Sequence, residues 1–238
     1  MTLQDQHSNR IFTESLTLED IHFVKTNVPR EDLIGWLKEN FDYVTGYHAS
    51  RPHDVGSYYT NGFLPSNFTK ADNDFKNMLS DVSYDGSYDP KPIFNEFQDD
   101  SNKKIYFSMN KEDFLDSDTH YLIYGSELIF NLAQDTHHSI KYHLNKIGIP
   151  TIFYCNIPIE DIDYKDLFDL YDRIVKSEGN LTERLYYITQ NYTITIDDYL
   201  SGKTIVKHIH PTTKLFDYHT NRYYKNSQEF CSICIPNL

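Results

Sequence analysis

Short segments of the chain alternate apolar and polar residues, a pattern that predicts β-strands. These segments are rich in Ile, Val, Tyr and Phe and span residues 11–28 (two extended pieces), 41–50, 103–109, 148–162, 183–190, 192–200 and 203–211. Other segments carry apolar residues three and four positions apart, which predicts amphipathic helices. The predicted helices span residues 29–40, 53–62, 120–134 and 166–179. The mixture of both element types predicts an α+β fold.

A polar and acidic segment, residues 66–102, interrupts this pattern. We predict a loop insertion there, long enough to act as a lid or as a binding element. The rest of the chain contains no internal repeat, low-complexity tract or linker. Because 238 residues suffice for one sizeable core, we expect residues 1–238 to form a single domain.

The composition is that of a globular protein, with 39% hydrophobic and 24% charged residues. The formal charge of -13 works against nonspecific binding to nucleic acid, since phosphate affinity comes from Lys and Arg. No segment has the run of about 18 apolar residues that a membrane helix needs, and the N-terminus lacks the apolar run of a secretory signal. We therefore expect a cytoplasmic protein with no membrane contact.

Cysteine and histidine offer few strong patterns. The chain has three cysteines, Cys155 and the Cys231–Cys234 pair of a CSIC sequence, which do not make a disulfide framework. His208 and His210 point to one face of a predicted strand and could seed a metal site, but nothing in the sequence links an acidic or cysteine ligand to them. Three further histidines, at positions 137, 138 and 143, lack the spacing of a metal-binding helix. We expect no metal.

Three polar or aromatic groups stand at the ends or along the length of predicted strands. His48 ends one strand, Tyr106 and Phe107 lie on a second, and Glu183 begins a third. A histidine, an aromatic residue and an acid placed in this way can line one pocket. Spacing alone does not decide between such a pocket and ordinary structural roles.

The order and context of these residues resemble a known family. The stretch YHASRPHDVGSYYTNGFLP resembles the first motif of ADP-ribosyltransferases of the poly(ADP-ribose) polymerase type, in which an aromatic residue and His precede a short helix. KKIYFSM is similar to the family's second motif, and TERLYYITQNYTITIDDYL is similar to the third, which Glu opens. The resemblance covers roughly residues 44–200, and the three motifs occur in the family's order.

The chain departs from the family pattern at several positions. Ala49 replaces the usual Gly after the His, and Lys104 stands where Gly commonly precedes Ile-Tyr. The acidic insertion lengthens the gap between the first two motifs. Glu127, in the sequence YGSELIF, competes with Glu183 for the role of the acid, because a Gly-Ser-Glu sequence that opens a helix can also place a carboxylate in a cleft.

The resemblance implies an ADP-ribosyltransferase-like fold, with split antiparallel sheets and flanking helices around an NAD cleft. It implies that Glu183 stabilises the oxocarbenium-like transition state formed when the nicotinamide–ribose bond breaks, a role for which Glu127 is the competing candidate. It also implies that His48 binds a ribose hydroxyl and that Tyr106 stacks on nicotinamide. The residues implied to contact NAD are His48, Ala49, Ser50, Tyr106 and Phe107.

The implied activity is transfer of ADP-ribose from NAD to a protein or nucleic acid. By the same resemblance, the chain would act as an intracellular toxin or phage-defence effector, with an antitoxin or regulatory protein as a partner. Three alternatives stay open: an NAD glycohydrolase, a catalytically degenerate module that uses the cleft for binding, and an unrelated α+β interaction protein whose motif matches are chance.

Overall fold

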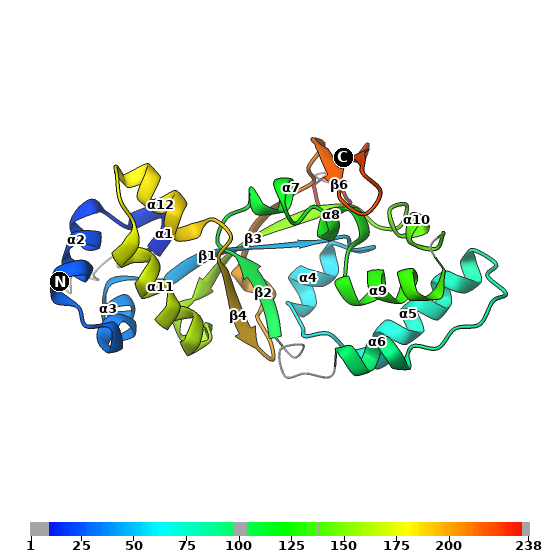
Figure 1. Ribbon diagram of the computed structural model, residues 1–238, viewed down its shortest axis with the longest axis horizontal. Helices are drawn as coiled ribbons and strands as arrows, with labels where there is room; N and C mark the ends of the chain where they lie inside the picture. The colour runs from blue at the N-terminus through cyan, green and yellow to red at the C-terminus, as the bar shows by residue number, and fades with distance from the viewer. Residues whose placement is uncertain (1–9, 98–103, 138, 235–238) are drawn as a thin grey trace, which may run out of the picture.

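The computed structural model describes residues 10–97, 104–137 and 139–234. It contains a five-stranded antiparallel sheet and a two-stranded hairpin, both flanked by helices (Figure 1). The sheet has the strand order β4-β2-β1-β3-β5 and is formed by β1 (Tyr43–Ser50), β2 (Lys104–Ser108), β3 (Thr151–Pro158), β4 (Thr193–Asp197) and β5 (Ile205–Ile209). The hairpin consists of β6 (Lys214–Asp217) and β7 (Arg222–Lys225). The predicted α+β class is confirmed.

The helices gather at two ends of the molecule (Figure 1). The end that holds the N-terminus contains α1 (Phe12–Ser15), α2 (Leu18–Asn27), α3 (Leu33–Asn40), α11 (Tyr164–Lys176) and α12 (Leu181–Thr189). The other end contains α5 (Phe68–Asp81), α6 (Lys91–Glu96), α9 (Glu127–Thr136) and α10 (Lys141–Leu144). Nearer the sheet lie α4 (Gly56–Asn61), α7 (Asp113–Asp116) and α8 (His120–Tyr124). None of the helices in the described residues combines the length and apolarity that crossing a bilayer requires.

The five-stranded sheet is split between β1 and β2. β1 pairs with β3 along its whole length, and β2 pairs with β4 along its whole length. Between β1 and β2, by contrast, the described strands pair at one position, Tyr47 with Ser108. The sheet therefore consists of a β4-β2 half and a β1-β3-β5 half that meet at one residue pair.

Two hydrophobic clusters cover opposite faces of this sheet. Side chains alternate between the faces along each strand. Val44, Phe107 and Phe153 accordingly belong to the cluster that also includes buried residues from the helices at the N-terminal end. Ala49 and Ile152 belong to the second cluster, with α5, α8 and α9. The sheet thus separates two cores, and a residue's position along its strand decides which core it faces.

Most of the predicted elements are confirmed. The strand predictions for 41–50, 103–109, 148–162, 192–200 and 203–211 correspond to β1, β2, β3, β4 and β5, and the helix predictions for 29–40, 53–62 and 166–179 also hold. The predicted helix 120–134 is broken into α8 and α9. Gly125 separates them with a φ of 86°, a left-handed conformation that glycine adopts readily.

The strand prediction for residues 11–28 is wrong, because this segment folds into α1 and α2. At the start of α2, the Thr17 side chain accepts a hydrogen bond from the Asp20 backbone N–H, and the Asp20 side chain accepts one from the Thr17 backbone N–H. This reciprocal capping satisfies donors that every helix leaves free at its N-terminus. The cap outweighs the rough alternation that suggested strands.

The loop prediction for residues 66–102 is also wrong for the part that the structure describes. Asn67 caps α5, and Phe75, Met78 and Leu79 form a buried face three and four residues apart. A second helix, α6, follows and buries Ile93. The polar majority of this segment is the solvent-facing side of amphipathic helices rather than a loop. Residues 98–102 lie outside the described residues.

Candidate functional site

His48 lies on β1 at the split in the sheet. Its Nδ1 atom is 3.0 Å from the main-chain oxygen of Tyr106 on β2. A carbonyl oxygen only accepts hydrogen bonds, so this contact places a proton on Nδ1. Burial lowers the pKa of His48, and the hydrogen bond to the carbonyl opposes that shift. The neutral ring therefore presents Nε2 as a hydrogen-bond acceptor.

Aromatic rings hold the His48 side chain in place. The ring centroids of Phe63 and Phe107 lie 5.1 Å and 5.5 Å from that of His48. Both phenylalanines are fully buried. Such packing leaves the imidazole few alternative rotamers, so its free nitrogen keeps one direction.

A cavity of about 190 Å³ opens beside His48. Its lining comes from β1, β2, α4, the residues after α4, and α5: His48, Ser57, Tyr58, Asn61, Gly62, Phe63, Leu64, Lys70 and Ile105. This lining, taken from the described residues, offers hydroxyl, amide and imidazole groups with one cation and no carboxylate. Such a set suits a polar or anionic ligand, and the volume suits one ring system rather than a whole dinucleotide.

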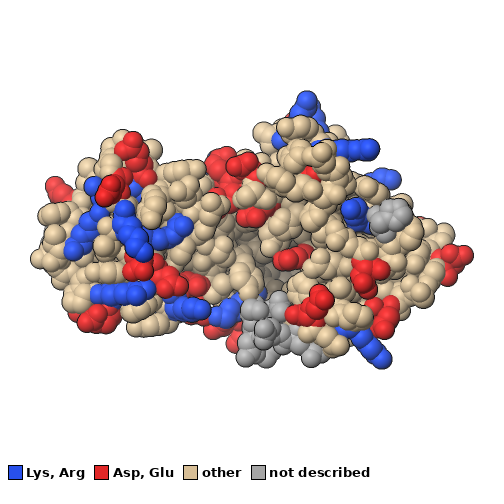
Figure 2. Space-filling view, in the orientation of Figure 1, with Lys and Arg blue, Asp and Glu red and all other residues tan. Residues whose placement is uncertain are grey.

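The cavity coincides with the split between the two halves of the sheet. His48 contributes from β1 and Ile105 from β2, on the side where the strands no longer pair. Figure 2 shows a hollow at the middle of the displayed face, near the position of β2 in Figure 1, bordered by acidic side chains, which the described lining of the His48 cavity lacks. The two sheet halves and α4 together build the cavity wall.

The Tyr106 side chain lies on the opposite face of the sheet from His48. Ile105 and Phe107 are buried on the His48 side, and Tyr106, between them, is 44% exposed. By strand alternation Tyr106 shares its face with Ser108 and with Tyr47, the partner of Ser108. The structure therefore brings His48 to the main chain of Tyr106, not to its ring.

Glu127 lies on the Tyr106 side of the sheet. It is the first residue of α9, as the sequence predicts, and its side chain is exposed. Its Oε2 atom is 3.4 Å from the Tyr121 hydroxyl. Burial raises the pKa of Tyr121, and the nearby charges of Glu127 and, to a smaller extent, Tyr106 add to that shift. Glu127, Tyr121 and Tyr106 are thus neighbours.

Glu183 does not begin a strand. It is the third residue of α12, where its Oε2 atom accepts the Asn180 backbone N–H at 2.8 Å and the Asn180 side chain accepts the Glu183 N–H. The strand prediction for residues 183–190 is wrong for this reason: Asn-x-x-Glu is a helix-start signal. The Glu183 carboxylate serves as a helix cap at the N-terminal end of the molecule (Figure 1).

The remaining residues that the resemblance assigned to NAD lie around His48. The Ser50 hydroxyl accepts a hydrogen bond from the Tyr58 hydroxyl at 3.1 Å, beside the cavity. Ala49 and Phe107 are buried in the two different cores, so their side chains are packing groups. These two residues can therefore contact a ligand only through their backbone atoms.

Sequence reasoning missed most of the cavity lining. Ser57, Tyr58 and Asn61 come from α4, which the sequence predicts but whose inward face it does not identify. Lys70 comes from α5, inside the segment predicted as a loop. The sequence signal for this helix is Asn67, a residue type that favours the N-cap position. Its side chain caps α5 by accepting a hydrogen bond from the Lys70 backbone N–H, three residues later.

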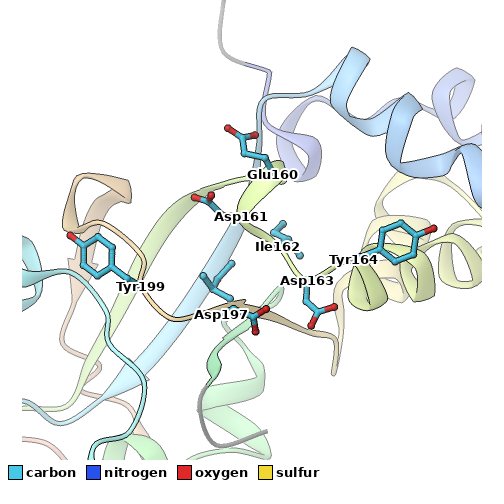
Figure 3. A pocket seen from close by; sticks show the side chains of 8 residues that line it. Glu160, Asp161, Ile162, Asp163, Tyr164, Asp197 and Tyr199 are labelled. Carbon is cyan, nitrogen blue, oxygen red and sulfur yellow. The ribbon is translucent and has the colours of Figure 1, made fainter. Parts of the chain in front are cut away.

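A second and larger pocket, about 430 Å³, lies where β4 approaches α11 (Figure 3). Four carboxylates line it: Glu160, Asp161, Asp163 and Asp197. Lys104 pairs with Asp163, and its Nζ atom is 3.6 Å from an Asp197 oxygen. One cation does not offset four acids, so this pocket repels a diphosphate. The smaller His48 cavity, with one cation and no carboxylate in its described lining, is the better candidate site for an anionic ligand.

Comparisons with known proteins add little to this description. No protein-family model matches the chain, and no curated protein matches it. One solved structure with detectable similarity is EcPltA, at 12% identity and a TM-score of 0.31, covering 81% of this chain and 88% of that chain. A TM-score of this size establishes neither a shared fold nor a shared activity.

Proposed function

We propose that the chain binds NAD at the split in its sheet and transfers ADP-ribose to a macromolecular acceptor, protein or nucleic acid. The observation that carries this proposal is the neutral His48, which presents a hydrogen-bond acceptor to a ring-sized cavity where β1 and β2 separate. The nicotinamide end of NAD would occupy the cavity, and Nε2 of His48 would accept a hydrogen bond from a ribose hydroxyl. Lys70 would attract the diphosphate.

The chemistry needs a carboxylate near the ribose. Breaking the bond between nicotinamide and C1 of the ribose leaves positive charge on the ribose, and neutral nicotinamide departs. The acceptor nucleophile then bonds to that carbon and loses its proton to a base. We assign the stabilising carboxylate to Glu127 rather than Glu183, because Glu183 is bound in a helix cap whereas Glu127 is exposed beside Tyr106 and Tyr121. Glu127 and His48 lie on opposite faces of the sheet, so this assignment requires the ribose to extend from the His48 cavity through the open split between β1 and β2 to the Tyr106 face.

Labelled NAD tests this assignment. Purified protein is incubated with NAD labelled in the adenylate part and with a cell extract, and both nicotinamide release and the label on protein or nucleic acid are followed. We expect Glu127→Gln and His48→Ala each to lower the transfer rate by about 100-fold or more. Glu183→Gln is the matched carboxylate control: it should keep the transfer rate and lower the free energy of unfolding by about 1 kcal/mol.

Two results would change the assignment. Loss of transfer in Glu183→Gln with normal activity in Glu127→Gln would reverse the roles of the two acids. Free ADP-ribose as the sole product, in extracts from several sources, would make water the acceptor and the protein an NAD glycohydrolase.

A second candidate function is a binding module without transfer activity. The observation that favours it is the cavity lining, which in the described residues contains no carboxylate. In this case calorimetry would detect NAD binding that His48→Ala weakens, while wild-type protein releases no nicotinamide. Absence of both binding and turnover in the wild type would refute the two candidates together.

A further inference from the structure

Four metal-ligating side chains meet at the C-terminal end of β5, away from the residues assigned to NAD. They are His208, His210, Cys231 and Cys234, and one ligand atom from each lies within 4.8 Å of all the others. His208 is the second-to-last residue of β5, and His210, which comes directly after the strand, lies on the same side of the chain. The two cysteines come from the chain that returns after the β6-β7 hairpin. We propose that these four residues form a structural zinc site.

The distances among three of the four ligand atoms match those of a tetrahedral zinc centre. Zn–S bonds of about 2.3 Å and Zn–N bonds of about 2.0–2.1 Å put two sulfurs about 3.8 Å apart and a sulfur and a nitrogen about 3.5 Å apart. The Sγ atoms of Cys231 and Cys234 are 3.7 Å apart. Nε2 of His208 lies 3.4 Å from Cys231 Sγ and 3.0 Å from Cys234 Sγ. His210, whose ligand atom lies within 4.8 Å of these three, would close around the ion as the fourth ligand.

Both imidazoles are already held in the orientation that a metal ligand requires. Nδ1 of His210 donates to the Pro150 carbonyl at 2.9 Å, and Nδ1 of His208 lies 2.7 Å from the Tyr59 hydroxyl. Metal-bound histidines commonly use their second nitrogen in this way, which fixes the tautomer and the ring plane. Nε2 of His208 faces the two cysteines, and Nε2 of His210 is the nitrogen left for a metal.

His210 supplies an independent observation. Its side chain is 8% exposed, and within the described residues its Nε2 atom has no hydrogen-bond partner. A buried polar atom without a partner costs about 1–3 kcal/mol, so it calls for a ligand. A zinc ion bound by Nε2 removes that cost. Two thiolates and two neutral imidazoles form a closed set of four ligands, as structural zinc sites have.

The zinc would tie the end of the chain to the wall of the His48 cavity. Tyr59, which contacts His208, belongs to α4, and the neighbouring Tyr58 lines the cavity. Ile233, between the cysteines, approaches Gly56 so closely that a Cβ added there would lie 3.4 Å from its Cδ1 atom. The metal site would therefore fix the position of α4 without contacting a ligand in the cavity.

Metal analysis of the full-length protein tests this proposal without any assay of NAD chemistry. The protein is expressed with zinc supplementation, purified under reducing conditions and analysed by plasma mass spectrometry. We expect about one zinc ion per chain. Replacement by Co²⁺ should give the visible bands of a tetrahedral ion and a near-ultraviolet thiolate-to-cobalt band, and refilling the reduced apoprotein with zinc should release about two protons per ion.

Variants then assign the ligands. We expect Cys234→Ser and His210→Ala to lose the stoichiometric zinc, while Cys155→Ala, a buried cysteine on β3 outside the cluster, and His53→Ala, an exposed histidine, should keep it. Tyr59→Phe removes only a hydroxyl group and should weaken zinc affinity by about 10–100-fold. The zinc affinity of Tyr59→Phe tests the site even if Cys234→Ser or His210→Ala fails to fold.

Three results would overturn the proposal. One is wild-type protein that contains no stoichiometric zinc and gives no thiolate-to-cobalt band. Another is an intact mass showing that reduced, metal-free protein readily forms a Cys231–Cys234 disulfide while zinc gives no protection. The third is equal zinc content in Cys234→Ser and wild type. Because every readout concerns the metal, failure here leaves the proposed NAD chemistry untouched, and the reverse also holds.

Discussion

Gly62 ends α4 at the rim of the His48 cavity, and its replacement by Ala gives the sharpest stability test of this geometry. Its φ of 71° and ψ of -163° fall in a region that is essentially restricted to glycine. A Cβ added to Gly62 would lie 2.3 Å from the Leu200 carbonyl oxygen and 2.7 Å from a Tyr199 ring carbon. Both the backbone conformation and the available space therefore oppose a side chain.

The expected cost combines two effects. Holding an L-residue in this conformation costs about 1–3 kcal/mol. Pushing the Cβ against a backbone oxygen costs roughly another 1–3 kcal/mol, because strand and loop atoms must shift. We expect Gly62→Ala to lower the free energy of unfolding by about 2–5 kcal/mol, which corresponds to a fall in Tm on the order of 10 °C for a chain of this size.

The matched control is Gly35→Ala. Gly35 lies inside α3, and a Cβ added there meets no atom within 4 Å. Alanine should stabilise this helix by about 0.5–1 kcal/mol. Urea unfolding followed by circular dichroism measures both variants against wild type, with the slope m as a check on two-state behaviour. A neutral or stabilising Gly62→Ala, beside a stabilising Gly35→Ala, would refute this account of how α4 ends.

Three further predictions concern buried polar groups. Arg51 donates to three backbone carbonyls and a tyrosine hydroxyl, so Arg51→Met should lower the free energy of unfolding, measured in urea, by about 3 kcal/mol. Arg222→Met, at an exposed position, should change it by less than about 0.5 kcal/mol, and equal effects of the two variants would contradict this role of Arg51. Asp113 accepts hydrogen bonds from the Ser108 hydroxyl at 2.6 Å and from a backbone N–H. Asp113→Ala should therefore lower the free energy of unfolding by about 2–3 kcal/mol and Asp113→Asn by less, and the reverse order would contradict this role of Asp113. Burial holds the pKa of His48 below 6.5, so as pH falls the unfolded chain binds a proton at this histidine before the folded chain does, and the free energy of unfolding should decline below about pH 6.5. His48→Gln should flatten this decline in unfolding curves recorded from about pH 7 to 5, and an unchanged slope would contradict the prediction.

The sequence predicted well those elements whose side chains face one buried layer. β3 is an example: Ile152, Phe153 and Cys155 are fully buried, and prolines flank the run, so composition alone identifies a strand. β1 and the short α4 were likewise predictable, the latter because Asn-Gly marks its end. In these cases local preference and tertiary packing point to the same structure.

In two segments, a helix-capping signal competes with an alternating pattern that favours a strand. The Leu185–Ile188 run of aromatic and branched residues suggests a strand, yet Asn180 and Glu183 form a capping box that the sequence displays openly. The same holds for Thr17 and Asp20 before α2. In both segments the cap signal, had it been given priority over alternation, would have predicted the helix.

The arrangement of the candidate site depended on information that the sequence does not contain. Which face of β2 carries Tyr106 follows from the pairing of Tyr47 with Ser108, and a shift of one residue would reverse it. In the same way, His208 and Cys234 are 26 residues apart in sequence and meet at 3.0 Å, because the β6-β7 hairpin turns the chain back. Long-range register and chain reversal are set by the whole fold.

The single residue pair that joins the two halves of the sheet has a mechanical consequence. Ladder hydrogen bonds give a sheet its resistance to bending, and here the described β1 and β2 share one paired position. Rotation of the β4-β2 half about the Tyr47–Ser108 junction would leave the pairing of β1 with β3 and of β2 with β4 intact. At this junction, resistance to rotation therefore comes from the His48–Tyr106 hydrogen bond and from the packing of Phe107 against Phe63, rather than from a ladder of strand hydrogen bonds.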